Sequence, residues 1–187
     1  MRVHLPSVVL ISLFFGGCQD GASDRQTKVT AAEQKAATTM HTVELGSWGN
    51  GAPALQIDLP VEYGAKKQEG PDFTVFYVEP AGAGDSGWKG VMGIYIGHHP
   101  DFAEMTPESV EESGAVGRKD VKWRCRGGQE EGRQVRRCET LVRGFYEGAG
   151  VDGGGVKELV LHLFISGEDA TQVQALKDAA KTLRLKQ

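Results

Sequence analysis

The sequence is poor in cysteine and aromatic residues, and it lacks the short motifs that name a reaction. It has three cysteines and 7% aromatic residues in 187 positions. No C-x-x-C pair and no Cys/His set at zinc-ligand spacing is present, which argues against a thioredoxin-like motif and a structural zinc site. The H-E-x-x-H, G-x-S-x-G and phosphate-loop patterns are absent too. No cofactor is therefore expected, and no internal repeat is seen.

An excess of basic residues is also missing. The chain has 21 Lys and Arg against 25 Asp and Glu, with a formal net charge of −4. Residues 1–17 hold one of these charges, Arg2, so the rest of the chain has 20 basic and 25 acidic residues, a net of −5. Nucleic-acid-binding domains are usually basic. The composition therefore gives no support to nucleic acid as a partner.

The most apolar segment of the chain lies at its start. Arg2 precedes residues 5–17, LPSVVLISLFFGG, which are all apolar or small. A membrane-spanning helix needs about 20 such residues, so the run is too short to cross a bilayer. A basic residue, a short apolar run and small residues before a cleavage point are typical of a secretory signal peptide. An ordinary secretory signal followed by a chance cysteine is one interpretation of residues 1–17.

The end of this segment resembles the lipobox of bacterial lipoproteins. Gly16 and Gly17 directly precede Cys18, although Phe15 stands where the lipobox usually has Leu. The resemblance implies that Cys18 carries a diacylglycerol thioether, that residues 1–17 are removed, and that the new amino group is acylated. Several acyl chains make a stable membrane anchor.

The expected location is the bacterial cell envelope, with the protein lipid-anchored at Cys18. By resemblance to enterobacterial sorting, Gln19 after the cysteine favours the outer membrane, facing the periplasm. Asp20 opposes that assignment, because acidic residues near the anchor can prevent release. Residues 18–40 have almost no large apolar side chains and are expected to form a flexible tether. Residues 41–187 suit a single domain.

Two cysteines remain after Cys18, and an oxidising compartment favours a disulfide between them. If Cys125 lies opposite Cys138 in a hairpin, the turn centres near Glu131 and Gly132, and Gly127 opposes Arg136. A structural disulfide is the simplest interpretation of the pair. A catalytic or sensing disulfide is the alternative.

The remaining pattern predicts an α+β fold, an antiparallel β-sheet with a C-terminal helix and one or more short helices packed on it. Asp169 and Gln172 resemble a capping box at the start of the C-terminal helix. Thr106, Pro107 and Glu108 predict a short helix that ends by Gly114, and residues 64–72 are expected to be a polar turn. The predicted strands are 42–45, 55–59, 73–79, 88–97, 116–126, 133–143 and 157–166.

The predicted hairpin gathers basic residues on one of its faces. Lys122, Arg124, Arg126 and Arg137 alternate onto the same side, with Glu139 among them. Such a surface suits an anionic protein, an anionic glycan or a lipid head group. The other interpretation is a solvated sheet face whose charges prevent edge pairing.

The segment GHHPDFAE, residues 97–104, is the best enzyme-like stretch. His98, His99, Asp101 and Glu104 are possible metal ligands and follow a predicted strand, where functional loops often start. Adjacent histidines on a strand point to opposite faces, however, so a polar loop without a metal is the alternative. His162, in the middle of a strand, is interpreted as a packed histidine.

The order of elements resembles the PsbP/Mog1-like fold over residues 42–185. The resemblance lies in ALQIDLPVEYGAKKQEGPDFTVFYVEP at residues 54–80 and DATQVQALKDAAKTLRLK at residues 169–186. It implies a central antiparallel sheet between helical layers and an accessory or binding role. No functional residue carries over, because no motif aligns residue by residue. The expected function is therefore a binding or accessory role in the periplasm, and the alternative is a periplasmic hydrolase or metal-dependent enzyme that uses residues 98–104.

Overall fold

The computed structural model describes residues 39–49, 52–82, 90–102, 104–130, 132–147 and 156–186. The predicted signal peptide, the lipidation site Cys18, the tether up to residue 38 and Trp88 lie outside the described residues. Among the helices that are described, none has the length and apolar character needed to cross a membrane.

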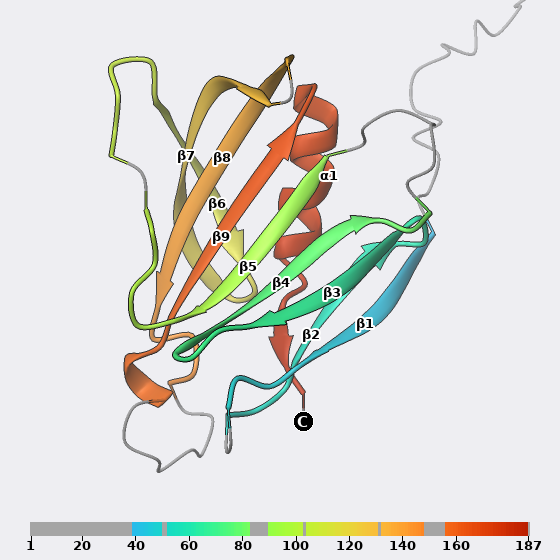
Figure 1. Ribbon diagram of the computed structural model, residues 1–187, viewed down its shortest axis with the longest axis vertical. Coiled ribbons are helices and arrows are strands. Elements are labelled where there is room, and N and C mark those ends of the chain that lie inside the picture. Colours follow the sequence, from blue (N-terminus) through green and yellow to red (C-terminus); the bar gives the residue numbers. More distant parts are fainter. Residues whose placement is uncertain are drawn as a thin grey trace, which may run out of the picture. The chain divides into compact units, whose positions relative to one another are not determined.

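The larger of two antiparallel sheets has seven strands in the order β3-β4-β5-β9-β8-β7-β6 (Figure 1). Two meanders, β3 to β5 and β6 to β9, join where β9 pairs with β5. The strands are β3 (Tyr63–Glu69), β4 (Phe73–Pro80), β5 (Val91–Gly97), β6 (Val110–Val116), β7 (Lys119–Glu130), β8 (Arg133–Arg143) and β9 (Val160–Gly167).

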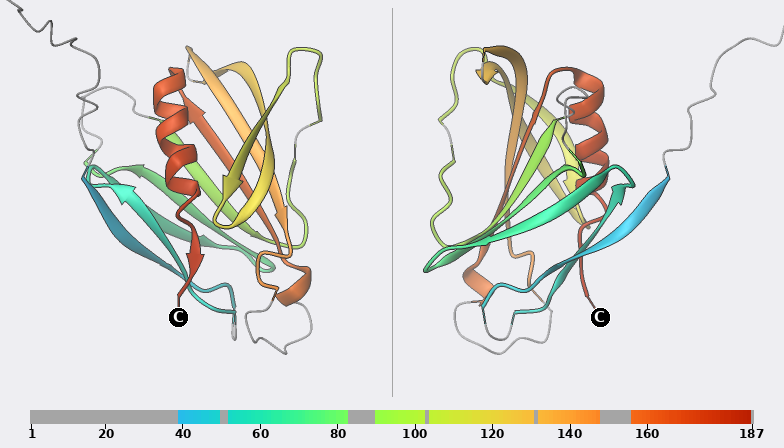
Figure 2. Two further views of the ribbon diagram at one scale, coloured as in Figure 1. Left: turned by 180° about the vertical axis from the view of Figure 1, so that it is seen from behind. Right: turned by 45° about the vertical axis from the view of Figure 1, so that its right-hand side comes forward.

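One face of this sheet, which we call the inner face, packs against the rest of the domain (Figure 2). The α-helix α1 (Ala170–Ala180) contacts β9, β8 and β6, and also β2 of the smaller sheet. That sheet has the order β1-β2-β10, formed by β1 (Met40–Gly46), β2 (Leu55–Pro60) and β10 (Arg184–Leu185). A 3-10 turn, η1 (Val156–Glu158), precedes β9. The opposite side of the seven-stranded sheet is the outer face.

Alternation along each strand explains why one face is buried. In β9, Leu161, Leu163 and Ile165 belong to the hydrophobic core cluster and are at most 1% exposed. The two residues between them, His162 and Phe164, point to the outer face. The same alternation in β4, β5, β7 and β8 places Phe76, Val78, Met92, Ile94, Ile96, Trp123, Cys125, Cys138 and Val142 in the core.

Several sequence predictions are confirmed. The sheet is antiparallel, and a C-terminal helix packs on it. Asp169 caps α1 by accepting a hydrogen bond from the backbone N–H of Gln172 at 2.8 Å. In the hairpin of β7 and β8, Cys125 lies opposite Cys138 and Gly127 opposite Arg136.

The prediction of a turn over residues 64–72 is wrong, since β3 occupies Tyr63–Glu69. β3 is an edge strand, and its last four residues are exposed. Lys66 pairs with Glu79 on the neighbouring strand, and Lys67 lies 2.5 Å from Glu69. Charged residues at an edge prevent pairing with other chains. That polarity made the strand resemble a loop in the sequence.

The predicted helix over residues 106–113 is also wrong. Thr106 and Ser109 form a turn, in which the Ser109 N–H donates to the Thr106 carbonyl at 2.9 Å, and β6 follows directly. Because the open edge of β7 needs a partner, pairing with β6 prevails over the local helix signal. The predicted strand 116–126 is accordingly divided: Val116 ends β6, and β7 begins at Lys119 after a turn.

Candidate functional site

The strand register sets out rows of side chains across the outer face. In one row Arg124 of β7, Glu139 of β8 and Phe164 of β9 lie directly opposite one another. In the next row Arg126, Arg137 and Ser166 do the same. The sheet therefore brings together three of the four basic residues that the sequence singled out.

Acidic residues lie among these arginines. The Nε of Arg137 donates to the Oε1 of Glu130 at 2.8 Å, and its Nη2 donates to the carbonyl of Gln129. The Nε of Arg124 is 3.9 Å from Glu111. For Arg126, the described part of the chain supplies no ion pair or hydrogen bond to the side chain. Lys122, the fourth predicted residue, is exposed and donates from Nζ to the Oγ of Ser113 at 2.7 Å.

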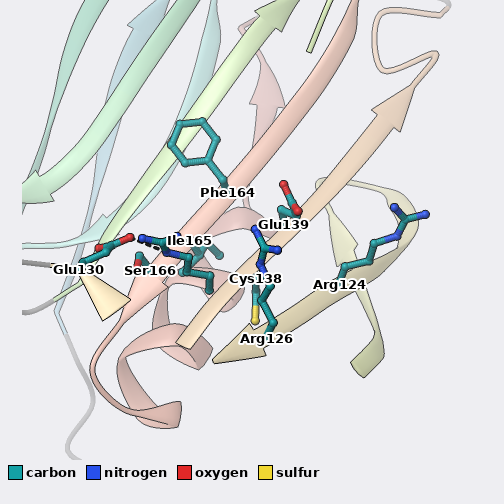
Figure 3. Close-up of a pocket in the computed structure, with 9 residues that line it drawn as sticks. Arg124, Arg126, Glu130, Cys138, Glu139, Phe164, Ile165 and Ser166 are labelled. Atoms are coloured by element: carbon teal, nitrogen blue, oxygen red, sulfur yellow. Dashed lines mark hydrogen bonds and ion pairs between the residues drawn. The ribbon is translucent and has the colours of Figure 1, made fainter. Parts of the chain in front are cut away.

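A cavity of about 240 Å³ lies among the three arginines (Figure 3). Its lining includes residues of β7, β8 and β9, so the hairpin and the central strand build it together. Ser166 lies in this lining and is 7% exposed, and the described residues offer its Oγ no hydrogen-bond partner. The lining residues are Arg124, Arg126, Glu130, Arg137, Cys138, Glu139, Phe164, Ile165 and Ser166.

Next to this cavity, His162 forms a hydrogen-bonded pair with Glu139. The Nε2 of His162 lies 3.1 Å from the Oε2 of Glu139, and the histidine is 5% exposed. Phe102 packs edge-on against the imidazole at 5.4 Å, and the Arg124 guanidinium lies 4.4 Å from the centre of the Phe102 ring. Burial lowers the pKa of His162, and the hydrogen bond that the imidazole donates to Glu139 opposes that shift. His162 is packed in the sheet, as predicted, but it also forms a hydrogen bond with Glu139.

A second cavity, of about 580 Å³, adjoins the first. Phe73 stacks on Tyr95, with ring centres 5.7 Å apart, and Phe164 lies against the backbone of Gly93, where any Cβ would overlap its ring. These rings are half-buried and leave part of their surface open. The lining residues are Asp72, Phe73, Tyr95, His99, Asp101, Glu139, His162 and Phe164.

The residues of the loop after β5 point in different directions, and only two of the predicted metal ligands line the second cavity. His99 and Asp101 line the second cavity, and the Oη of Tyr95 accepts a hydrogen bond from the backbone N–H of His99 at 3.2 Å. His98 instead packs against Trp48, with ring centres 5.8 Å apart. Glu104 is exposed and lines neither cavity. The four residues predicted as weak metal ligands therefore do not converge on one point.

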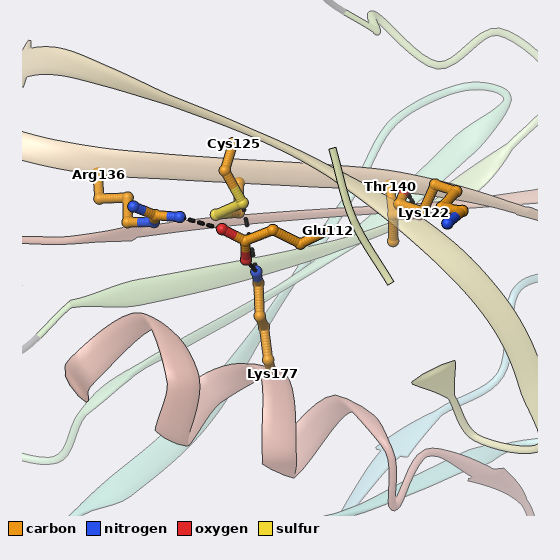
Figure 4. Close-up of a disulfide and its surroundings, with 7 residues drawn as sticks. Glu112, Lys122, Cys125, Arg136, Thr140 and Lys177 are labelled. Atoms are coloured by element: carbon orange, nitrogen blue, oxygen red, sulfur yellow. Dashed lines mark hydrogen bonds and ion pairs between the residues drawn. A yellow bond between two sulfur atoms is a disulfide. The ribbon is translucent and has the colours of Figure 1, made fainter. Parts of the chain in front are cut away.

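The inner face carries a different polar cluster, next to the disulfide (Figure 4). Cys125 and Cys138 are bonded at 2.04 Å, with their Cα atoms 4.1 Å apart. Lys177 of α1 is 5% exposed; its Nζ lies 2.5 Å from Glu112 and 3.2 Å from the Sγ of Cys125. The hydrogen bond from Lys177 lowers the pKa of Glu112, and Arg136, also paired with Glu112, adds to the shift.

Within the described residues, the only group with metal-ligand spacing is Glu112 with the two cysteines. Both sulfur atoms are already bonded to each other, and a metal ligand needs a thiolate. This group is therefore a disulfide with a neighbouring ion pair, and it is not a candidate metal centre.

Sequence reasoning missed the aromatic residues of the outer face and the pairing of Glu139 with His162. The alternation of β9 and β5 identifies Phe164 and Tyr95 as residues on the side away from the core. Their proximity to the arginines follows from the β8–β9 and β5–β9 registers, which connect segments about 25 and 70 residues apart in the chain. No local pattern fixes such registers.

Comparisons with known proteins give no family. No protein-family model matches the chain, and no curated protein matches it. A crystal structure of a protein from Bacteroides thetaiotaomicron is similar over 71% of this chain and 45% of that one, with 12% identity and a TM-score of 0.43. This chain thus spans less than half the length of that protein.

Proposed function

We propose that the chain is a lipid-anchored protein of the bacterial cell envelope, whose outer sheet face binds an anionic partner in the periplasm. One observation carries the binding role: Arg124, Arg126 and Arg137 line a cavity on a face that no other described element of secondary structure covers. The anchor rests on the resemblance of residues 15–18 to a lipobox. The Gln19 position favours the outer membrane.

The arrangement of charge supports binding over a merely solvated surface. Arg126 and Arg137 lie directly opposite each other on neighbouring strands, and like charges in this position are destabilising. A surface kept charged only for solubility gains nothing from placing two guanidinium groups side by side. An anion between them turns that repulsion into two charge-assisted hydrogen bonds.

The experiment is capture of the partner from native membranes by mild crosslinking, with wild type compared with Arg124→Gln, Arg126→Gln and Arg137→Gln combined. We expect the triple variant to lose most of the captured material at low salt, and the difference to shrink at high salt, where the attraction is screened. Arg143→Gln is the matched control, because Arg143 lies on β8, is exposed and lines neither cavity. Equal capture by all three proteins would refute the role of this face.

The anchor has its own test. Cys18→Ser should abolish acylation and leave the chain unprocessed or in the soluble fraction, which intact mass and membrane fractionation measure. A wild-type protein without the mass of acyl chains would refute the anchor while leaving the binding face untouched.

A second candidate function is a hydrolase, favoured by the pair of His162 and Glu139 beside the cavity that holds His99 and Asp101. A histidine oriented by a carboxylate can act as a general base. Among the described residues, the lining of that cavity has no Ser, Thr, Cys or Lys side chain, and the candidate reaction is therefore attack by a water that His162 activates. If His162→Gln and Glu139→Gln both abolish hydrolysis of an ester, peptide or glycoside substrate, the protein is an enzyme.

A further inference from the structure

The two cavities of the outer face adjoin each other, since Glu139 and Phe164 line both of them. We call the two cavities together the groove. Along β9 the groove runs from Ser166 to His162, four residues, which corresponds to about 13 Å at 3.3 Å per residue. A ligand that fills it must therefore be elongated and must differ in chemistry from one end to the other.

One end of the groove is built for an anion. Arg126 has no partner in the described part of the chain, and it lies opposite Arg137, which still faces the cavity while paired with Glu130. Ser166 lies in the same row, and its buried Oγ has no hydrogen-bond partner in the part of the chain that the structure describes. A buried hydroxyl without a partner costs free energy. A carboxylate or phosphate at this end would accept from the hydroxyl and from both guanidinium groups.

The other end has the chemistry that recognises uncharged, hydroxyl-rich rings. Phe73 and Tyr95 form a stacked, half-buried pair, and such rings offer apolar contact area to a flat ligand. The exposed carboxylates of Asp72 and Asp101 accept hydrogen bonds and have none to donate. Because these two acids and Glu139 repel an anion, the charged part of a ligand is held at the arginine end.

We propose that the groove binds a short acidic oligosaccharide, with its anionic group between Arg126 and Arg137 and an uncharged sugar ring on Phe73 and Tyr95. This inference rests on the proposed function, since it names the partner of the same face. A zwitterionic peptide is the competing occupant. Its ammonium group would meet Asp72 and Asp101, which are solvent-exposed, and exposed ion pairs contribute little.

The test is calorimetric titration of the purified full chain at low salt with four probes: cellobiouronate, which has one carboxylate and one uncharged ring, maltose phosphate, maltotriose and trialanine. The first two distinguish a carboxylate from a phosphate as the anionic group. We expect at least one of these acidic sugars to bind at least tenfold more tightly than maltotriose, and trialanine not to bind. A tenfold change corresponds to about 1.4 kcal/mol, within the range of one hydrogen bond to a charged group.

Three variants locate the two ends of the ligand. Arg126→Gln should weaken the acidic sugar about tenfold and leave maltotriose unchanged, whereas Tyr95→Leu should weaken both sugars. Arg143→Gln carries the same loss of charge on the same sheet outside the groove, and should change neither. NMR spectra of each variant check that the fold is retained.

Other outcomes overturn the inference. Equal losses in Arg126→Gln and Arg143→Gln would mean nonspecific attraction of anions, and binding of trialanine alone would mean a peptide site. If no probe binds while membrane capture still depends on the arginines, the sugar is wrong and the anion-binding face stands. If capture is also independent of them, the proposed function fails with it.

Discussion

The two faces of the seven-stranded sheet differ in whether their charged side chains have partners. On the inner face, Lys177 is almost completely buried and its ammonium group contacts Glu112 and the sulfur of Cys125. On the outer face, Arg126 is half-buried, faces another arginine, and has no ion pair within the described residues. A buried charge is tolerated where it is paired and hydrogen-bonded. The inner cluster therefore serves the fold, and the outer cluster is left available for something that is not part of the fold.

The largest expected difference between the faces concerns aromatic residues. Trp123 on the inner face is 1% exposed, and Trp123→Ala should cost about 3–5 kcal/mol of unfolding free energy, because it removes a large buried side chain and leaves a cavity. Tyr77→Ala is the outer-face counterpart: Tyr77 is 37% exposed, and we expect a cost of about 1 kcal/mol or less. Urea denaturation measures both. Equal costs would show that the outer face is also a core.

The disulfide provides the next effect. Replacing Cys125 and Cys138 by alanine should lower the unfolding free energy by about 3 kcal/mol, since the bond closes a short loop and restricts the unfolded chain. Circular dichroism should show the same sheet and helix at low temperature and a lower melting temperature. Peptide mapping of the wild type should find the two cysteines joined. Free thiols, or an unchanged melting temperature, would contradict this prediction.

The dependence of the unfolding free energy on pH distinguishes the two faces, because His162 on the outer face and Glu112 on the inner face lose their contributions in different pH ranges. The pKa of His162 is lowered in the folded protein, so the unfolded chain takes up a proton first, at about pH 6.5. Stability is therefore full above pH 6.5 and falls as the pH drops from there through the lower, folded pKa. His162→Gln should remove this slope. The loss that begins below pH 4.5, where Glu112 on the inner face is protonated in the unfolded chain, should remain in the variant. An unchanged slope above pH 5 in His162→Gln would rule out the histidine.

The smallest expected change in unfolding free energy tests directly whether Arg126 is a structural residue. Arg126→Gln should change the unfolding free energy by at most about 0.5 kcal/mol, in the stabilising direction, because it removes repulsion from Arg137. Arg143→Gln controls for the general loss of a positive charge. A clear destabilisation by Arg126→Gln, absent in the control, would show that the arginine is a structural residue.

The sequence was informative where a local pattern determines the outcome. The strand patterns predicted β2, β4 and β8, the cap at Asp169 predicted the start of α1, and the expected disulfide between Cys125 and Cys138 predicted the hairpin register that the structure shows. It failed at β3 and β6, which are the two edges of the seven-stranded sheet. Edge strands are polar and carry turn residues, so their sequences resemble loops.

Only the arginine end of the candidate site could be predicted from the sequence. The arginines alternate along one hairpin, so their common face follows from the sequence. The aromatic and acidic end draws on β4, β5, β9 and the loop after β5. Its assembly depends on β9 pairing with β5 across a connection that includes three other strands. Local propensity carries no information on such long-range pairings.

The small sheet has a consequence for the order in which the protein folds. β1 and β2 are neighbours in the chain and can pair early, but β10 completes their sheet from the far end of the sequence. Arg184 forms hydrogen bonds with Asp58, 126 residues away, and the Asp58 N–H donates to Thr182. Closing so long a loop is slow, and domains with many distant contacts fold in milliseconds to seconds. Until β10 has been synthesised and has paired with β2, the edge of β2 therefore stays open to other chains.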